Sequence, residues 1–345
     1  MEINLGKVPF DLDFHPSSPL LATALISGDL HLYRYVADGQ SQRILNIAAH
    51  TESCRAVRFV NSGEVLLTAS PDLSLLATDV ETGTAIARLN DAHGAAINRV
   101  ISLSETTVAS GDDEGCIKVW DIRSRTCCNT FEAHEDWISD MTSVNQLQLI
   151  ATSGDGTLSV CNLRKNKVEN RSEFSEDELL SVIVMKNGRK VVCGSQSGVL
   201  LLYSWGQFDD CSDRFTGIPM SIDALLKFDE NTLISGSEDG ILRLVGILPN
   251  RIIQPLAEHS EYPIEGIAFS HDREFLGSIS HSPILKLWNM QELLANTPSF
   301  PSDPITTADS DDEMAIDENV NQGSRVRRSA GGQSSVASSN FFADL

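Results

Sequence analysis

The chain of 345 residues is 41% hydrophobic but only 6% aromatic, so aliphatic side chains must supply most of its core. A formal net charge of −22 argues against direct, general binding to nucleic acid, and seven cysteines without a C-x-x-C pair indicate reduced thiols in a cytosolic or nuclear protein. The N-terminus has no basic leader and no apolar run approaches the length of a membrane span, so neither a signal peptide nor a transmembrane segment is expected.

A period just above 40 residues organises the chain from its start to about residue 293. A histidine that opens a repeat recurs at this spacing in His50, His93 and His134, and again at His259. A second marker closes a β-prone segment in every repeat. This period is typical of repeats that each form one four-stranded blade of a β-propeller. The seven closing markers are Tyr33, Thr78, Trp120, Cys161, Tyr203, Val245 and Trp288.

We therefore predict an all-β fold, a seven-bladed WD40 β-propeller over residues 1–293. The predicted blades are 6–47, 48–91, 92–132, 133–175, 176–216, 217–257 and 258–293. Repeat six shows the pattern of four strands, at 221–228, 232–235, 241–245 and 252–256. Repeat seven lacks a convincing fourth strand. Because a closed ring removes the unpaired edge, we predict that residues 3–5 supply this strand.

Residues 294–345 have a different composition. Three prolines are followed by an acidic run at 309–313, by Arg325, Arg327 and Arg328, and by a Gly/Ser stretch. Such a segment buries too little apolar surface to offset its chain entropy, so we predict a disordered acidic tail. Two interpretations of Phe341-Phe342 stay open, a docking motif and weak packing on a blade. The arginines are either a nuclear import signal or a solvated basic cluster.

Several repeats combine His, Ser or Thr, and Asp, a set that also occurs in hydrolases. An enzyme needs one such set in a cleft, whereas this chain repeats it, so catalysis is not favoured. We expect instead a buried line of hydrogen bonds in these blades, each worth about 1 kcal/mol net. Repeats five to seven are expected to rely on packing. The predicted sets are His93, Ser110, Asp113 and Trp120 in repeat three; His134, Asp155 and either Thr152 or Ser153 in repeat four; and His50, Ser70 and Asp72 in repeat two.

The remaining motifs give no sign of an enzyme or a cofactor. The sequence at 194–198 is followed by a strand rather than a helix, so it is a turn and not a nucleophile elbow. Asp112, Asp113 and Glu114 are adjacent carboxylates, and a solvated turn is favoured over a weak cation site. We predict a non-catalytic protein without a cofactor or metal.

The clearest candidate for a binding site is Trp120-Asp121-Ile122-Arg123. Asp121 ends a strand, where its carboxylate is placed to accept backbone N–H bonds from the following turn. Arg123 then projects toward one rim of the ring. It forms either a local ion pair with Asp121 or Glu132, worth about 0–1 kcal/mol, or an arginine hot spot for a protein partner. Repeat four keeps only Arg164 of this sequence.

The stretch 108–123 resembles the sixteen-residue box of WD40 proteins that act as substrate receptors of cullin-four RING ubiquitin ligases. In those receptors the Asp and Arg of the W-D-x-R ending lie where the receptor meets a large propeller adaptor, damaged-DNA-binding protein one. The resemblance implies that Asp121, Arg123 and Arg164 bind such an adaptor.

More widely, residues 1–293 resemble the WD-repeat-containing protein 55 family. The resemblance rests on residues 9–16 and 49–57, together with Phe341-Phe342 near the C-terminus. That resemblance implies a eukaryotic protein of the nucleus and nucleolus, with roles in ribosomal RNA processing and in growth and development.

Two hypotheses follow for a protein-interaction scaffold in the nucleus, the nucleolus and the cytoplasm. The first is a substrate receptor of a cullin-four RING ligase, with a protein substrate that the sequence does not identify. The alternative is a nuclear or nucleolar scaffold in ribosomal RNA processing and ribosome assembly. Neither hypothesis involves a membrane or requires direct contact with nucleic acid.

Overall fold

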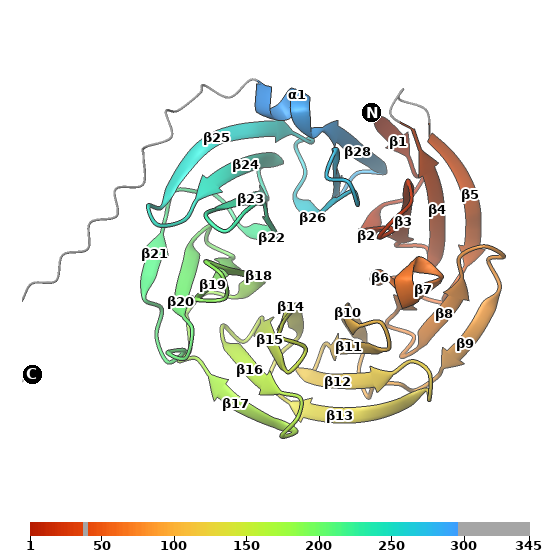
Figure 1. The fold of residues 1–345 in the computed structure, drawn as a ribbon, viewed down its shortest axis with the longest axis horizontal. Helices are drawn as coiled ribbons and strands as arrows, with labels where there is room; N and C mark the ends of the chain where they lie inside the picture. The colour runs from red at the N-terminus through yellow and green to blue at the C-terminus, as the bar shows by residue number, and fades with distance from the viewer. Residues whose placement is uncertain (37–40, 296–345) are drawn as a thin grey trace, which may run out of the picture. The chain divides into compact units, whose positions relative to one another are not determined.

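The computed structural model describes residues 1–36 and 41–295, which form seven four-stranded antiparallel sheets arranged as the blades of a ring (Figure 1). This is the seven-bladed β-propeller that the sequence predicts. The first three blades, from inner to outer strand, are β2 (Pro9–Phe14), β3 (Leu20–Leu25), β4 (Asp29–Tyr35) and β5 (Ser41–Ala48); β6 (Ala56–Val60), β7 (Val65–Ala69), β8 (Leu75–Asp79) and β9 (Ala85–Leu89); and β10 (Ile97–Ser104), β11 (Thr107–Asp112), β12 (Cys116–Asp121) and β13 (Thr126–Glu132).

The next three blades repeat this order, and the seventh takes its outer strand from the N-terminus. Blades four to six are β14 (Ile138–Val144), β15 (Gln148–Ser153), β16 (Leu158–Asn162) and β17 (Lys167–Arg171); β18 (Leu179–Met185), β19 (Lys190–Ser195), β20 (Leu200–Ser204) and β21 (Asp213–Phe215); and β22 (Ile222–Lys227), β23 (Thr232–Ser237), β24 (Ile241–Gly246) and β25 (Arg251–Glu258). Blade seven is β26 (Ile264–Phe269), β27 (Phe275–Ser280), β28 (Ile284–Asn289) and β1 (Glu2–Asn4). A 3₁₀ turn, η1 (Asn61–Gly63), joins β6 to β7.

The hydrophobic core is divided among the spaces between adjacent blades. Within the described residues, each of seven clusters of buried side chains joins one pair of neighbouring blades, including the pair formed by blades seven and one. The middle strands are buried on both faces because a blade lies on either side of them, whereas the outer strands expose one face. A blade therefore needs both neighbours to bury its apolar surface.

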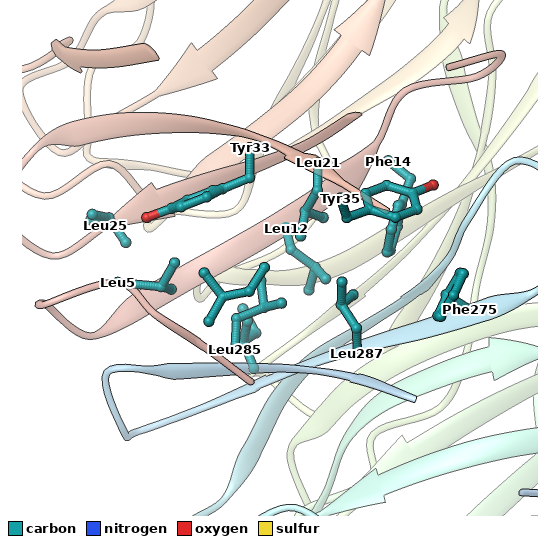
Figure 2. Packing of buried hydrophobic residues seen from close by; sticks show 12 residues of the cluster. Leu5, Leu12, Phe14, Leu21, Leu25, Tyr33, Tyr35, Phe275, Leu285 and Leu287 are labelled. Carbon is teal, nitrogen blue, oxygen red and sulfur yellow. The ribbon is translucent and has the colours of Figure 1, made fainter. Parts of the chain in front are cut away.

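The ring closes through β1, which pairs antiparallel with β28 and places Ile3 opposite Leu285. The Met1 amino group donates to the Leu287 carbonyl at 2.8 Å, and Leu5 N donates to the Pro283 carbonyl at 2.8 Å. Ile3 and Leu5 are buried in the cluster between blades seven and one, which Figure 2 shows from close by. The N-terminal residues thus provide the outer strand that repeat seven lacks.

A short helix that is not predicted from the sequence follows the last strand. Helix α1 (Met290–Ala295) begins after Asn289, whose Oδ1 accepts N–H bonds from Gln291 at 2.9 Å and Glu292 at 3.3 Å. Its Met290 and the two leucines after Glu292 pack against the cluster between blades six and seven.

The helix changes the predicted start of the tail, because the two residues after 293 belong to it. The rest of the predicted disordered tail, with Arg325, Arg327, Arg328 and Phe341-Phe342, lies outside the described residues. No helix among the described residues is long and apolar enough to span a membrane.

Candidate protein-binding site on one rim of the propeller

The buried polar set of blade three is centred on His93. Its Nδ1 lies 2.8 Å from Asp112 Oδ2 and its Nε2 lies 2.6 Å from Ser110 Oγ, which also accepts the Trp120 Nε1–H at 2.8 Å. Burial raises the pKa of Asp112, but the bonds from His93 and from backbone N–H groups outweigh burial and lower it overall.

The prediction that Asp113 belongs to this set is wrong. Ser110 and Asp112 lie two residues apart, so their side chains leave the strand on the same face, and Asp113 comes after the strand has ended. The Asp113 carboxylate instead accepts from Arg55 Nη1, at 2.8 and 3.0 Å.

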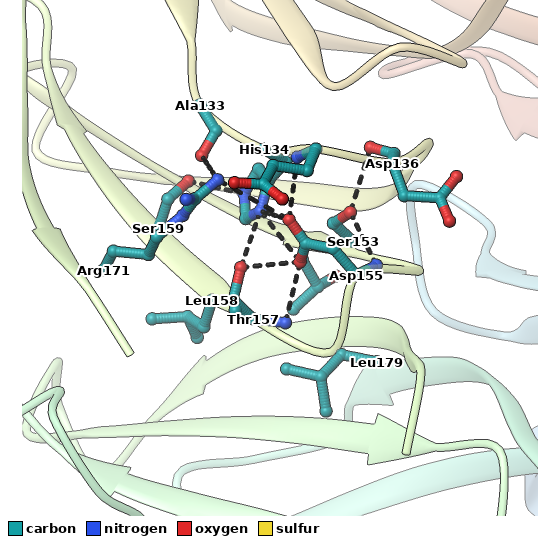
Figure 3. Close-up of polar contacts among 12 residues, drawn as sticks. Ala133, His134, Asp136, Ser153, Asp155, Thr157, Leu158, Ser159, Arg171 and Leu179 are labelled. Atoms are coloured by element: carbon teal, nitrogen blue, oxygen red, sulfur yellow. Dashed lines mark hydrogen bonds and ion pairs between the residues drawn. The ribbon is translucent and has the colours of Figure 1, made fainter. Parts of the chain in front are cut away.

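In blade four the predicted histidine and aspartate meet, but the hydroxyl comes from another strand (Figure 3). His134 Nδ1 lies 3.2 Å from Asp155 Oδ2, and its Nε2 lies 2.8 Å from Ser159 Oγ on β16. The prediction of Thr152 or Ser153 is wrong, since Ser153 donates to the Asp136 carbonyl and Thr152 accepts from Ser139. The reason is a substitution. Ala151 occupies the strand position that Ser110 has in blade three, and Ser159 pairs with it across the ladder.

Blades two and seven contain versions of the same set. His50 Nε2 lies 2.9 Å from Thr68 Oγ1, not near Ser70 as predicted, because Thr68 is the counterpart of Ser110. In blade seven His259 Nδ1 lies 2.7 Å from Ser278 Oγ, which accepts from Trp288 Nε1 at 2.8 Å. The expectation that repeat seven relies on packing alone is therefore wrong.

These buried polar sets support the structure of the blades and are not reaction centres. The side chains of His50, His93 and His134 are 0% exposed, so no substrate reaches the imidazoles. The potential ligand atoms of His93, Asp112 and Cys116 also lie within 4.8 Å of one another, close enough to bind one metal ion together. Both ring nitrogens of His93 are already hydrogen-bonded, to Asp112 and to Ser110, so hydrogen bonding within the blade accounts for this cluster without a metal ion.

The turn after β12 presents the W-D-x-R residues at the surface. Asp121 Oδ1 accepts the backbone N–H of Arg123 at 2.8 Å and of Ser124 at 3.0 Å, as predicted, and these bonds lower the pKa of the carboxylate. The Arg123 side chain is exposed. Among the described residues its guanidinium forms no ion pair with Asp121 or Glu132, and the Asp121 carboxylate attracts its charge only at longer range.

Arg164 occupies the equivalent turn of the neighbouring blade and is also exposed. Asn129, on the outer strand of blade three, donates through Nδ2 to the Leu163 carbonyl at 3.1 Å and to Asn166 Oδ1 at 3.0 Å. These bonds tie the outer strand of blade three to the turn that contains Arg164, across the blade boundary. The turn after β14 adds Leu147, whose carbonyl accepts from Leu163 N and whose side chain is 51% exposed.

We define the rim surface as Asp121, Arg123, Leu147 and Arg164. Asp121, Arg123 and Arg164 are predicted from the sequence, whereas Leu147 is not. An apolar residue in the short polar turn Asn145-Gln146-Leu147 is the signal that would have identified it.

The comparisons with known proteins agree with this architecture. The family model described as WDR55 matches residues 1–293. The chain belongs to the WDR55 family. Its relatives include WD repeat-containing protein 55 from Arabidopsis thaliana, 60% identical over 85% of this chain and 84% of the relative, and the protein of that name from Homo sapiens, 38% identical over 82% and 75%. WD repeat-containing protein JIP5 from Coprinopsis cinerea is 38% identical over 84% of this chain and 74% of its own length.

Membership of the WDR55 family establishes the coarse function. The chain is a WD-repeat propeller that serves as a scaffold for protein–protein interaction. None of the three names above is that of an enzyme. The rim surface is the candidate contact on this scaffold, because two exposed guanidiniums and an exposed leucine lie on turns of adjacent blades.

Proposed function

We propose that this WDR55-family protein is a non-catalytic substrate receptor of a cullin-four RING ubiquitin ligase. Its rim surface binds the damaged-DNA-binding-protein-one adaptor through Asp121, Arg123 and Arg164. The observation that carries the proposal is Arg123, an exposed guanidinium that forms no ion pair within the described residues, on a turn that Asp121 holds through two backbone bonds. A preorganised turn lowers the conformational entropy that binding must overcome.

The rim surface fits a protein partner in its chemistry. A guanidinium presents five donors in one plane and also stacks on apolar or aromatic surfaces, so arginine is enriched among the residues that dominate interfaces. Leu147 adds an exposed apolar side chain beside the turn that contains Arg164. The mixture of arginine and leucine suits an interface with an apolar centre and a polar edge.

A pull-down with the purified adaptor tests the proposal. The full chain is expected to retain the adaptor, and Arg123→Ala is expected to lose it. Lys7→Ala removes an exposed cation between β1 and β2, so it serves as the control and should bind like the wild type. Failure of the wild type to retain the adaptor, or equal retention by Arg123→Ala, would falsify the receptor role.

The alternative proposal is a nuclear or nucleolar scaffold in ribosomal RNA processing and ribosome assembly, supported by membership of the WDR55 family alone. It predicts that depletion causes precursor ribosomal RNA to accumulate and that Arg123→Ala restores processing as well as the wild type. The receptor proposal predicts that Arg123→Ala does not rescue the phenotypes of depletion. Both proposals place the protein in the nucleus and nucleolus, with a cytoplasmic pool, which imaging of a tagged chain would test.

A further inference from the structure

A cavity of about 510 Å³ lies at the mouth of the central channel, at the end of the blades opposite the rim surface. In each antiparallel blade the first and third turns lie at one end, so the second turn and the connection to the next blade lie at the other. Arg123 lies in a third turn, whereas Asp113 lies in a second turn and Arg55 and Trp137 lie in connections between blades. All seven blades contribute to the cavity lining.

The cationic groups of this cavity already have partners within the protein. Arg55 Nη1 donates to both oxygens of Asp113, at 2.8 and 3.0 Å, and Arg99 Nε donates to the Ser139 carbonyl at 2.5 Å. Arg99 is also attracted to the carboxylate of Asp140 deeper in the channel. The side of the cavity formed by blades two to four is therefore close to electrically neutral.

The opposite side, formed by blades six and seven, has excess negative charge. Asp223 accepts from Ser221 Oγ at 2.9 Å, and Glu265 lies 2.8 Å from Nε2 of the half-exposed His281. Asp223 forms no ion pair with a lysine or arginine of the described chain. Burial raises its pKa to about 6, and repulsion from Glu265 and Glu238 adds to that shift. A carboxylate held in such surroundings is stabilised by any cation that enters the cavity.

An indole completes the lining. Trp137 packs against Gly154, where a Cβ would overlap its Nε1, so only a glycine leaves room for the indole in this position. The side chain is partly exposed in the cavity, and its Nε1–H has no hydrogen-bond acceptor among the described residues. A fixed aromatic ring beside carboxylates favours cations with an apolar stem, because the ring attracts the charge and covers the methylene groups.

We propose that the mouth of the central channel binds one arginine or lysine side chain of a protein partner. Asp223 and Glu265 neutralise its charge and Trp137 contacts its stem or guanidinium plane. Charge complementarity selects this occupant. Anions are repelled by the excess carboxylates, and a neutral apolar side chain would desolvate those carboxylates without neutralising their charge. The site is at the opposite end from the rim surface, so it stands independently of the ligase role.

Selection from a displayed library of random peptides of about twelve residues tests the proposal. Peptides enriched on the full wild-type chain should share one invariant arginine or lysine. The best synthetic peptide should bind Asp223→Asn/Glu265→Gln about tenfold more weakly than the wild type, since one charge-assisted contact is worth about that factor. The same peptide with citrulline in place of the invariant arginine, or acetyl-lysine in place of the invariant lysine, should bind the wild-type chain about as weakly.

The matched control is Glu81→Gln/Glu292→Gln, which removes the same charge from exposed side chains away from the cavity. It should bind the peptide like the wild type, which separates local contacts from the general acidity of the surface. Trp137→Ala should also weaken binding, with circular dichroism verifying the fold. The proposal is overturned if no peptides enrich, if they share no basic residue, or if the two double variants bind alike. Loss of binding in EDTA would overturn it as well, because a divalent cation would then be the ligand.

Discussion

At the scale of residues, the position of a side chain along the strand decides whether it contacts the buried histidine of its blade, and its residue type alone does not. Ser110, Thr68 and Ser278 occupy one position in three blades, and each contacts the histidine of its own blade. Where this position is Ala151, the hydroxyl comes from the facing strand. The sequence identified the histidines correctly. It misassigned Asp113 because adjacent polar residues differ only in the face to which they point, and it misassigned the blade-four hydroxyl because Ala151 occupies the expected position.

Replacement of Ser110 tests the energetic importance of these sets. Ser110→Ala removes the hydroxyl that contacts both His93 and Trp120, and it leaves two buried polar groups without a partner. We expect a loss of about 2–3 kcal/mol in the free energy of unfolding. Ser102→Ala removes an exposed hydroxyl of the same blade and should change the free energy by less than about 0.5 kcal/mol. Thermal unfolding monitored by circular dichroism measures both, and equal midpoints for the two variants would contradict the account.

The raised pKa of Asp223 predicts a dependence of stability on pH. A carboxyl whose pKa rises from 3.8 unfolded to about 6 folded binds more protons in the folded state between these values. It therefore destabilises the fold as the pH rises through this window, and the cost is fully present above about pH 6.

Asp223→Asn should accordingly raise the unfolding midpoint at pH 7.5 by about 2–4 °C, as a gain of about 1 kcal/mol would. The difference from the wild type should shrink as the pH falls from 6 to 4. Melting curves at several pH values provide the measurement, with Glu81→Gln as the control. A gain that is the same at pH 4 and pH 7.5 would show that the carboxyl is not strained by its surroundings.

At the scale of elements, β1 determines whether the ring closes. It contributes the backbone pairing with β28 and buries Ile3 and Leu5 between two blades. The sequence predicted this strand because repeat seven lacked a fourth one. It did not predict α1, although Asn289-x-x-Glu292 before Leu293-Leu294 is a helix-start pattern, because six residues give too short a periodic signal.

Deletion of residues 2–6 should lower the unfolding midpoint sharply. Two buried aliphatic side chains represent about 3–6 kcal/mol of burial, and the edge of β28 becomes unpaired. Asn4→Gln changes an exposed side chain of β1 and should melt like the wild type. An unchanged midpoint after the deletion would mean that β1 does not hold the ring closed.

At the scale of the whole molecule, the blades separate two surfaces. The rim surface presents exposed arginines, and the channel mouth presents carboxylates in excess of its cations. Period and strand order were predictable from sequence because every blade repeats them. The channel mouth was not, because its lining comes from seven separate blades and only the closed ring brings Trp137, Asp223 and Glu265 to one cavity.

The separation predicts independent binding at the two ends. Asp223→Asn/Glu265→Gln should bind the adaptor as the wild type does, and Arg123→Ala should bind the selected peptide as the wild type does, because distant sites without shared partners act additively. Titration of each variant with each ligand measures this. Loss of both activities in either variant would show that the substitution disturbs the fold or that the two sites are coupled.

The central claim is that the W-D-x-R turn joins this propeller to a ligase adaptor. The most direct test is the dissociation constant of the purified adaptor for the wild type and for Arg123→Ala, measured at one fixed salt concentration. Loss of an arginine hot spot costs at least about 2 kcal/mol, so we predict that Arg123→Ala binds at least about 30-fold more weakly. A dissociation constant for Arg123→Ala within about twofold of the wild-type value would contradict the claim.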